Sequence, residues 1–232
     1  MAATIYLIPS QLDDQGFHVL PAYLLDAIKD CEVFFVENER TARRYLKQLW
    51  REMVIDDYEW HGIHKAEDAV VNEFRQKVKE GKRIGIISEA GCPGVADPGQ
   101  RLVQAAQELQ ATVRPLVGPS SILLALMASG MNGQQFHFHG YLPIDNAQRI
   151  KVVRELESNS ARQQCTQLFI ETPYRNNAML DTLIKQCKPD TRICVAVDLT
   201  GPKEWVRTRT VKQWQHDVPD LHKRPAIFLL QA

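Results

Sequence analysis

Short apolar runs alternate with amphipathic segments along the first half of the chain, and this alternation constrains the fold more than any other feature. Runs rich in β-branched and aromatic residues are typical of buried strands, and apolar residues three and four positions apart are typical of helices. The pattern predicts strands at 4–9, 32–36, 83–88 and 111–116, and helices at 21–28, 39–49, 67–79 and 100–109. Elements in this order build a mostly parallel sheet with helices on its faces. We therefore expect an α/β domain at 1–116.

The second half of the chain has a different order of elements. The predicted strands are 136–141, 167–171, 192–199, 204–210 and 225–230, and the predicted helices are 122–129, 147–158, 176–186 and 211–216. Only one short helix separates the last three strands, which favours antiparallel pairs in a mixed sheet. The halves meet at the turn-rich segment 117–121 (VGPSS). We place a domain boundary there and expect a second α/β domain, with a mixed sheet, at 117–232.

Composition excludes several other classes of protein. The 232 residues are 44% hydrophobic and 24% charged, which is typical of a globular protein and not of a disordered chain or a simple coiled coil. The five cysteines form no CxxC pair, and the first residues lack the pattern of a secretory signal. No apolar run approaches the roughly 18 residues that cross a bilayer. We expect a cytoplasmic protein without a membrane partner.

Charge is balanced over the whole chain but not between its halves. The formal net charge is +0, so the molecule as a whole does not attract polyanions. Residues 1–116 contain 14 basic and 18 acidic side chains, a net charge of −4, whereas 117–232 contain 14 and 10, a net charge of +4. The second half is thus the better candidate to contact an anionic partner. A solvated surface without a partner explains the same asymmetry.

The segment 88–99 (SEAGCPGVADPG) follows a predicted buried strand and ends where a helix begins. Open α/β sheets bind ligands at this edge, and twelve residues exceed the usual two to six of such a connection. Gly91 and Gly94 allow the backbone to approach a ligand closely. The segment contains neither GxxxxGK[ST] nor GxGxxG, which disfavours a nucleoside triphosphate or a classical dinucleotide. We expect a binding loop for another ligand.

Polar residues follow two other predicted strands. Glu37 can meet a ligand hydroxyl after the strand at 32–36, and Arg40 can meet an anion. Arg175 stands in a similar position in the second half and can bind a carboxylate or a phosphate. Arg207 and Arg209 are two positions apart on a predicted strand, so both guanidinium groups lie on the same face of it. Phosphate and solvent are equally suitable neighbours for them there.

Histidines do not suggest a metal site. His61 and His64 have the spacing HxxH, and His137 and His139 alternate along a predicted strand. Neither pair has the neighbouring cysteine or carboxylate partners that a zinc site requires. We therefore expect no bound metal.

Five segments in their order along the chain resemble the tetrapyrrole methylase family, the class III methyltransferases that use S-adenosylmethionine (SAM). The segments are 36–40 (VENER), 87–99 (ISEAGCPGVADPG), 115–119 (PLVGP), 140–143 (GYLP) and 171–175 (ETPYR). Within the family they are most similar to the branch that methylates a cytidine 2′-hydroxyl in small-subunit ribosomal RNA. The similarity runs nearly from end to end of the chain.

The resemblance implies two α/β domains with SAM in the cleft between them, a homodimer, and a role in ribosomal RNA processing. Glu37 would assist or orient the acceptor hydroxyl. The residues that it implies for SAM are Ser88, Glu89, Ala90, Pro93, Ser120, Tyr141 and Ala226. The residues that we expect to contact RNA phosphates are Arg40, Arg175, Arg207 and Arg209.

Some positions depart from the family pattern. The first loop reads PSQLD at 9–13 without the usual glycines, and Asn38 replaces an aspartate. The common RELTK is VDLTG at 197–201, and the common GE is Arg224-Pro225. Two other functions therefore stay open: methylation of a tetrapyrrole-like or other small molecule, and a SAM-binding module without catalysis. A steep dependence of binding on salt distinguishes RNA from a small molecule.

Overall fold

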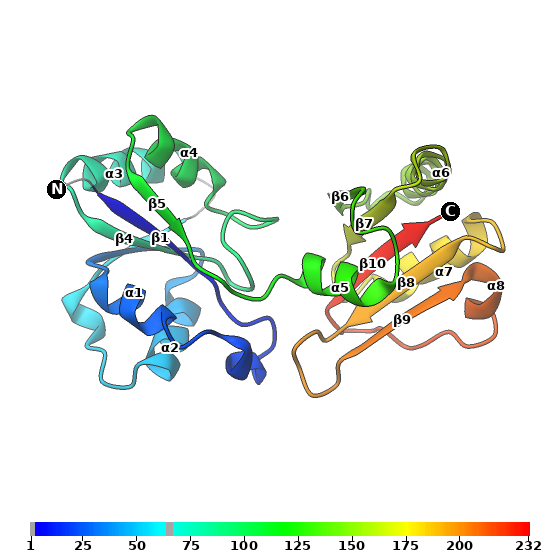
Figure 1. The fold of residues 1–232 in the computed structure, drawn as a ribbon, viewed down its shortest axis with the longest axis horizontal. Coiled ribbons are helices and arrows are strands. Elements are labelled where there is room, and N and C mark those ends of the chain that lie inside the picture. Colours follow the sequence, from blue (N-terminus) through cyan, green and yellow to red (C-terminus); the bar gives the residue numbers. More distant parts are fainter. Residues whose placement is uncertain (1–2, 64–66) are drawn as a thin grey trace. The chain divides into compact units, whose positions relative to one another are not determined.

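The structure is a computed structural model that describes residues 3–63 and 67–232, in two units, Met1–Ser120 and Ser121–Ala232 (Figure 1). The strands of the first unit are β1 (Thr4–Ile8), β2 (Val33–Val36), β3 (Glu59–Gly62), β4 (Arg83–Ile87) and β5 (Thr112–Pro115). Its helices are α1 (Leu24–Asp30), α2 (Glu39–Leu49), α3 (Glu67–Lys79) and α4 (Gln100–Glu108), with 3-10 turns at Gly16–Val19 and Ile55–Asp57. The predicted boundary before Val117 stays a prediction.

The first unit is a parallel sheet of strand order β3-β2-β4-β1-β5. Helices α1 and α2 cover one face and α3 and α4 the other, below and above the sheet in Figure 1. The interior strand β2 is apolar throughout because both of its faces are buried. The predicted α/β architecture with a mostly parallel sheet is confirmed.

Strand β4 passes β2 so closely that only glycine fits in its middle. A Cβ atom at Gly85 would lie 2.7 Å from Phe34 Cδ1 and 2.9 Å from Ile8 Cδ1. Phe34 and Ile8 are fully buried, so neither ring nor methyl group can move into solvent. The glycine therefore allows Phe34 to fill the centre of this core layer.

Strand β3 is not predicted by the sequence pattern. Its residues, EWHG, do not alternate in the way a strand requires, and they lie at the edge of the sheet. The Trp60 ring stacks on Phe34 with centroids 4.9 Å apart, and the His61 ring stacks on Phe35 at 4.6 Å. Packing on β2 rather than local sequence preference holds this strand.

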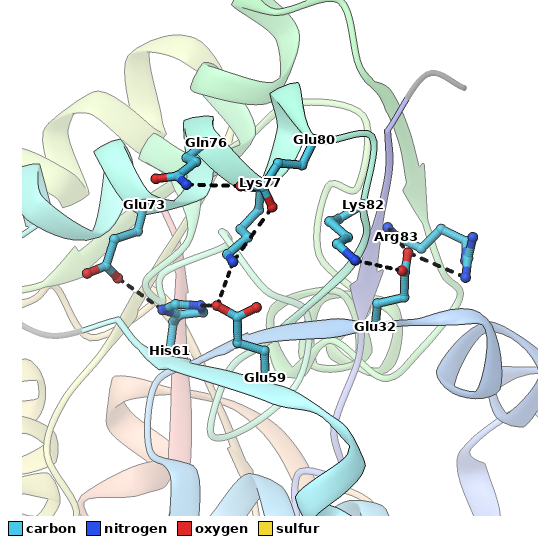
Figure 2. Close-up of polar contacts among 9 residues, drawn as sticks. All are labelled: Glu32, Glu59, His61, Glu73, Gln76, Lys77, Glu80, Lys82 and Arg83. Atoms are coloured by element: carbon cyan, nitrogen blue, oxygen red, sulfur yellow. Dashed lines mark hydrogen bonds and ion pairs between the residues drawn. The ribbon is translucent and has the colours of Figure 1, made fainter.

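Polar contacts join β3 to α3 (Figure 2). His61 Nε2 lies 2.8 Å from Glu59 Oε1, and His61 Nδ1 lies 3.0 Å from Glu73 Oε2. Lys77 Nζ lies 2.7 Å from Glu59 Oε1, and this contact holds the pKa of Glu59 below its ordinary value. These polar contacts connect the edge strand to the helix beside it.

The second unit contains a five-stranded mixed sheet of order β6-β7-β10-β8-β9. Its strands are β6 (Phe136–Tyr141), β7 (Thr166–Ile170), β8 (Arg192–Val197), β9 (Trp205–Thr210) and β10 (Ala226–Gln231). Its helices are α5 (Ser121–Ser129), α6 (Asn146–Gln163), α7 (Asn176–Gln186) and α8 (Val211–Trp214). Only β6 and β7 pair in parallel, so the predicted mixed sheet is confirmed.

Helices α6, α7 and α8 pack on one face of this sheet, and α5 lies against the other. Trp214 is fully buried in the first of these layers, and its indole N–H donates to the Ile193 carbonyl oxygen at 2.9 Å. Within the described part of the chain, every helix is too short or too polar to cross a lipid bilayer.

Candidate functional site

The strand order of the first unit opens a site between β1 and β4. After β1 the chain enters α1 on one face of the sheet, and after β4 it enters α4 on the other face. When the helices that follow two neighbouring parallel strands lie on opposite faces of the sheet, a crevice forms at the carboxyl ends of the strands. Proteins of the α/β class bind ligands in this crevice. The predicted loop 88–99 leaves β4 at this point.

Hydrogen bonds tie the loop after β4 to the loop after β1. Ser10 N–H donates to the Gly91 carbonyl oxygen at 2.9 Å, and Gly91 N–H donates to the Ser10 carbonyl oxygen at 3.2 Å. The Ser10 hydroxyl donates to the Ser88 carbonyl oxygen at 2.8 Å. Gly91 has φ +73°, a backbone conformation that other residues rarely adopt, so glycine is needed where the two loops meet.

The segment after β5 joins the same group of loops. A Cβ atom at Gly118 would lie 2.1 Å from Pro9 Cβ, so the two backbones touch only because Gly118 has no side chain. Cys92 Sγ lies 3.5 Å from the Pro119 carbonyl oxygen. Val117 N–H donates to the Tyr23 hydroxyl at 2.6 Å. Three loops thus form one frame at the carboxyl edge of the sheet.

Glu37, directly after β2, lies beside Glu89 of the loop after β4 at the same edge of the sheet, and both were expected to be site residues. Glu89 N–H donates to Glu37 Oε2 at 3.0 Å, and the Thr41 hydroxyl donates to the Glu89 carboxylate. Asn38 caps α2, since its Oδ1 accepts the N–H groups of Arg40 and Thr41 at 3.0 and 3.3 Å. An aspartate oxygen would cap the helix in the same way, so the replacement at 38 keeps this local structure.

Sequence reasoning did not select Thr41 or Ser10. Thr41 lies one position beyond the segment 36–40, and Ser10 lies within the segment 9–13, which differs from the family pattern. Their importance comes from contacts with the loop after β4, which is distant in sequence. Only the strand order brings them to that loop.

Ser88 supplies a buried hydroxyl that faces no protein partner. The residue is 4% exposed, and its Oγ has no hydrogen-bond partner among the described residues. Buried polar groups are nearly always satisfied, so an unsatisfied hydroxyl beside a binding loop fits the polar group of a ligand. Of the other predicted cofactor residues of this unit, Ala90 is exposed, Pro93 buried and Ser120 half-buried.

Asp97 adds a third carboxyl group to this edge. Burial, followed by the charges of Glu37 and Glu89, raises its pKa from 3.8 to about 6. Three acidic side chains therefore influence one another here, and together they favour a positively charged ligand. The sequence gives no signal for Asp97 beyond its place in the loop.

In the second unit, strand pairing brings several predicted residues to one edge of the sheet. Tyr141 at the end of β6 pairs with Ile170, which pairs with Ile227, the neighbour of Ala226. Tyr141 is 60% exposed, whereas Ala226 is buried. Arg175 follows β7 at the same edge.

The predicted arginines have different surroundings. Arg175 donates to the buried Glu171 carboxylate at 2.5 Å, and Arg209 pairs with Asp217 at 2.7 Å. The Arg207 guanidinium lies 5.0 Å from the centroid of the Trp205 ring. Arg40, in the first turn of α2, is exposed. Their roles as phosphate contacts stay predictions.

Two histidines of the predicted spacings have polar neighbours of their own. His61 belongs to the contacts of β3 and α3, and His64 lies outside the described residues. His139 Nε2 lies 2.6 Å from Gln167 Oε1. Within 3–63 and 67–232, no group of three His, Cys, Asp or Glu side chains is arranged to hold a metal ion.

Residues 20–215 match the profile of the family described as Tetrapyrrole (Corrin/Porphyrin) Methylases. Two curated relatives carry the name ribosomal RNA small subunit methyltransferase I. The protein from Micromonospora olivasterospora is 34% identical over 182 residues, which cover 78% of this chain and 55% of the relative. The protein from Bacillus subtilis (strain 168) is 29% identical over 203 residues, which cover 86% and 65%. The chain spans less than two thirds of either relative.

A solved structure shares the fold. Uroporphyrin-III-C-methyltransferase from Thermus thermophilus is similar with a TM-score of 0.58 and 17% sequence identity, over 100% of this chain and 93% of that one. At this identity the similarity concerns the fold and not the activity.

Proposed function

Since this chain belongs to the tetrapyrrole (corrin/porphyrin) methylase family, we propose that it is a methyltransferase that uses SAM as its methyl donor. The observation that carries the proposal is the frame of three loops around the unsatisfied Ser88 hydroxyl, at the position where α/β sheets bind ligands. Glu89 and Ala90 in the loop after β4 are exposed and can contact the cofactor directly.

The residues of this edge fit SAM in charge and in hydrogen bonding. SAM supplies a methyl group on a positively charged sulfur, which is already activated for transfer to an oxygen nucleophile. The carboxylates of Glu37, Glu89 and Asp97 give the edge a negative potential that suits this charge. Ser88, Glu89, Ala90, Pro93 and Ser120 are the contacts that we propose in this unit. Tyr141 and Ala226 are proposed from the resemblance.

Glu37 has an oxygen available for the methyl acceptor. Its Oε2 accepts the Glu89 N–H at 3.0 Å, which fixes the carboxylate, and Oε1 can accept a hydrogen bond from an acceptor hydroxyl. In this position Glu37 orients the hydroxyl and takes its proton as the oxygen is methylated. Neither a metal nor a covalent intermediate is needed for this proton transfer.

We propose that the acceptor is a ribose 2′-hydroxyl in small-subunit ribosomal RNA. The names of the two curated relatives support this choice of RNA. The net charge of +4 in 117–232 is favourable for a polyanion. Arg40, Arg175, Arg207 and Arg209 are the proposed phosphate contacts.

We also propose that the protein acts in the cytoplasm as a homodimer. All five cysteines are free thiols, four of them buried, which agrees with a reducing compartment. The homodimer rests on the resemblance to the family. Sedimentation at several protein concentrations tests it, and a monomer at all of them would contradict it.

Calorimetric titration with SAM, followed by incubation with small-subunit RNA from a strain that lacks this protein, tests the proposed function. Transfer of a methyl group to one ribose supports it. SAM binding without methyl transfer to RNA would favour a small molecule as the acceptor. SAM binding without transfer to any acceptor would favour a SAM-binding module without catalysis. Absence of SAM binding would refute the proposal.

Replacing Glu37 with glutamine tests the proton acceptor. Glutamine keeps a carbonyl oxygen for the Glu89 N–H but is not a base, so we expect a fall in turnover of about 10²–10⁴-fold with SAM affinity unchanged. Unchanged turnover would show that Glu37 only holds the loop.

A further inference from the structure

One edge of the second sheet carries an exposed group of aromatic and basic side chains. The strands β7 and β8 end at this edge, and β9 and β10 begin there. The segments that meet at the edge are 171–177, 198–204 and 220–225. We define the residues Tyr174, Lys203, Trp205, Arg207, Lys223 and Arg224 as the basic-aromatic surface.

The backbone at this edge is held in unusual conformations. Asp198, Thr200 and Lys223 have φ of 49°, 69° and 60°, although none of them is glycine. Such conformations cost free energy and gather at functional sites. The buried polar atoms Arg175 Nε and Thr200 Oγ1 also have no hydrogen-bond partner among the described residues. Strain and unsatisfied groups at one place indicate a site that binds a polar ligand.

Tyr174 presents an exposed ring beside a cation. The residue is 69% exposed, and Lys223 Nζ lies 5.8 Å from its ring centroid. The His222 ring lies edge-on to it at 5.9 Å. Lys223 N–H donates to the Pro173 carbonyl oxygen at 3.0 Å, which holds the two segments together. A large, mostly exposed ring is suited to stacking with a planar ligand.

Arg224 connects Tyr174 and Lys223 to Trp205. It donates to Asp198 Oδ2 from Nε at 2.8 Å and from Nη2 at 2.6 Å, and also to the Lys203 carbonyl oxygen at 2.9 Å. Its guanidinium lies 5.8 Å from the Trp205 ring centroid, with Arg207 5.0 Å from the same ring. The surface is therefore continuous from Tyr174 to Arg207.

Three of the acidic groups at this edge already have hydrogen-bond or ion-pair partners, and the exposed Glu204 accepts the Thr200 N–H at 2.6 Å. Glu171 accepts from Arg175, and Asp198 accepts from Arg224. Asp220 accepts from the Asn177 amide and the His222 N–H, which lower its pKa. In contrast, Lys203, Arg207 and Lys223 form no close ion pair within 3–63 and 67–232, although the charge of Arg207 helps to lower the pKa of Asp217. These cations remain available to an anionic ligand.

We propose that the basic-aromatic surface binds single-stranded RNA, with a base stacked on Tyr174 and phosphates on Lys223, Lys203 and Arg207. Single strands are recognised by stacking on aromatic rings and by cations along the backbone, and both are present at this edge. The inference rests on the proposed function, because it assigns the RNA that is methylated to this surface.

The test measures binding of a short unstructured fluorescent RNA to the full chain by anisotropy, together with SAM affinity by calorimetry. Tyr174→Ala should weaken RNA binding about tenfold, and Tyr174→Phe should bind as the wild type does, since stacking needs only the ring. Lys223→Gln should reduce the salt dependence by roughly one phosphate contact. The control Lys188→Gln removes an exposed lysine from the turn after α7 and should change neither. SAM affinity should be equal in all variants.

Several results would overturn the proposal. Equal RNA affinity of Tyr174→Ala and the wild type would exclude base stacking, even if the wild type methylates RNA and the proposed function stands. A loss of RNA affinity with Lys223→Gln but not with Tyr174→Ala would show that phosphates bind here without a stacked base, which would overturn the proposed mode of binding. Tyrosine-dependent RNA binding without any methyl transfer would support the surface and refute the proposed function.

Discussion

Replacing Asp97 with asparagine should stabilise the first unit at neutral pH. In the folded protein the pKa of this carboxyl rises from 3.8 to about 6, because it is partly buried and lies near Glu37 and Glu89. A difference of about two pKa units corresponds to a free energy of roughly 3 kcal/mol against folding. Water still reaches the half-buried group, so we expect about 1–2 kcal/mol.

The sign of this effect follows from proton binding. The native state holds the Asp97 proton more tightly than the unfolded state, so the Asp97 contribution to the free energy of unfolding falls as pH rises from about 4 to about 7. Above that range both states are ionised, and the penalty is constant. Asparagine has no proton to lose and removes the dependence.

Amide hydrogen exchange in β1 and β4 at increasing denaturant measures the unfolding of this unit alone. The stabilising effect of Asp97→Asn should be largest at about pH 7.5 and nearly absent at about pH 4. The control Asp56→Asn changes an exposed carboxyl in the turn Ile55–Asp57 and should have little effect. An equal effect of Asp97→Asn at both pH values, or none at pH 7.5, would refute the reasoning.

Two substitutions test the close packing of the first unit. Gly85→Ala should lower the free energy of unfolding of this unit by about 1–3 kcal/mol, because the new methyl group overlaps the buried Phe34 ring. Denaturant unfolding measures this change. An unchanged midpoint would show that the ring can move. Gly118→Ala should weaken SAM binding measured by calorimetry, since the methyl group pushes the segment after β5 away from Pro9, and full affinity would show that this frame is not needed for the cofactor.

The sequence predicts most helices and strands because their apolar residues have a clear period. Helix α3 begins and ends as predicted, since apolar residues recur along it and Gly81 follows its end. Helix α6 continues to Gln163, beyond the predicted end at 158. The prediction stops too early because the last turns of the helix are polar and show no apolar period. Strand β3 is missed because its stability comes from Phe34 and Phe35 on the neighbouring strand.

The sequence likewise predicts some residues of the candidate site and not others. Glu37 and Glu89 stand directly after predicted strands, so their neighbourhood follows from the parallel sheet. The bonds of Thr41 and Ser10 to the loop after β4, and that of Arg224 to Asp198, depend on loop paths that no local pattern encodes. Tertiary structure is needed to find them.

The burial of the cysteines determines which thiol a chemical reagent will reach. Burial raises the pKa of Cys187 to about 12 and that of Cys194 to about 11, and Cys31 and Cys165 are also buried, so these four react slowly at neutral pH. Cys92 is only half-buried and lies in the loop after β4, although burial and then the charge of Asp97 raise the pKa of its thiol as well. A maleimide dye should therefore attach at Cys92 first, and the native chain carries its own labelling position for a spectroscopic reporter beside the proposed cofactor site.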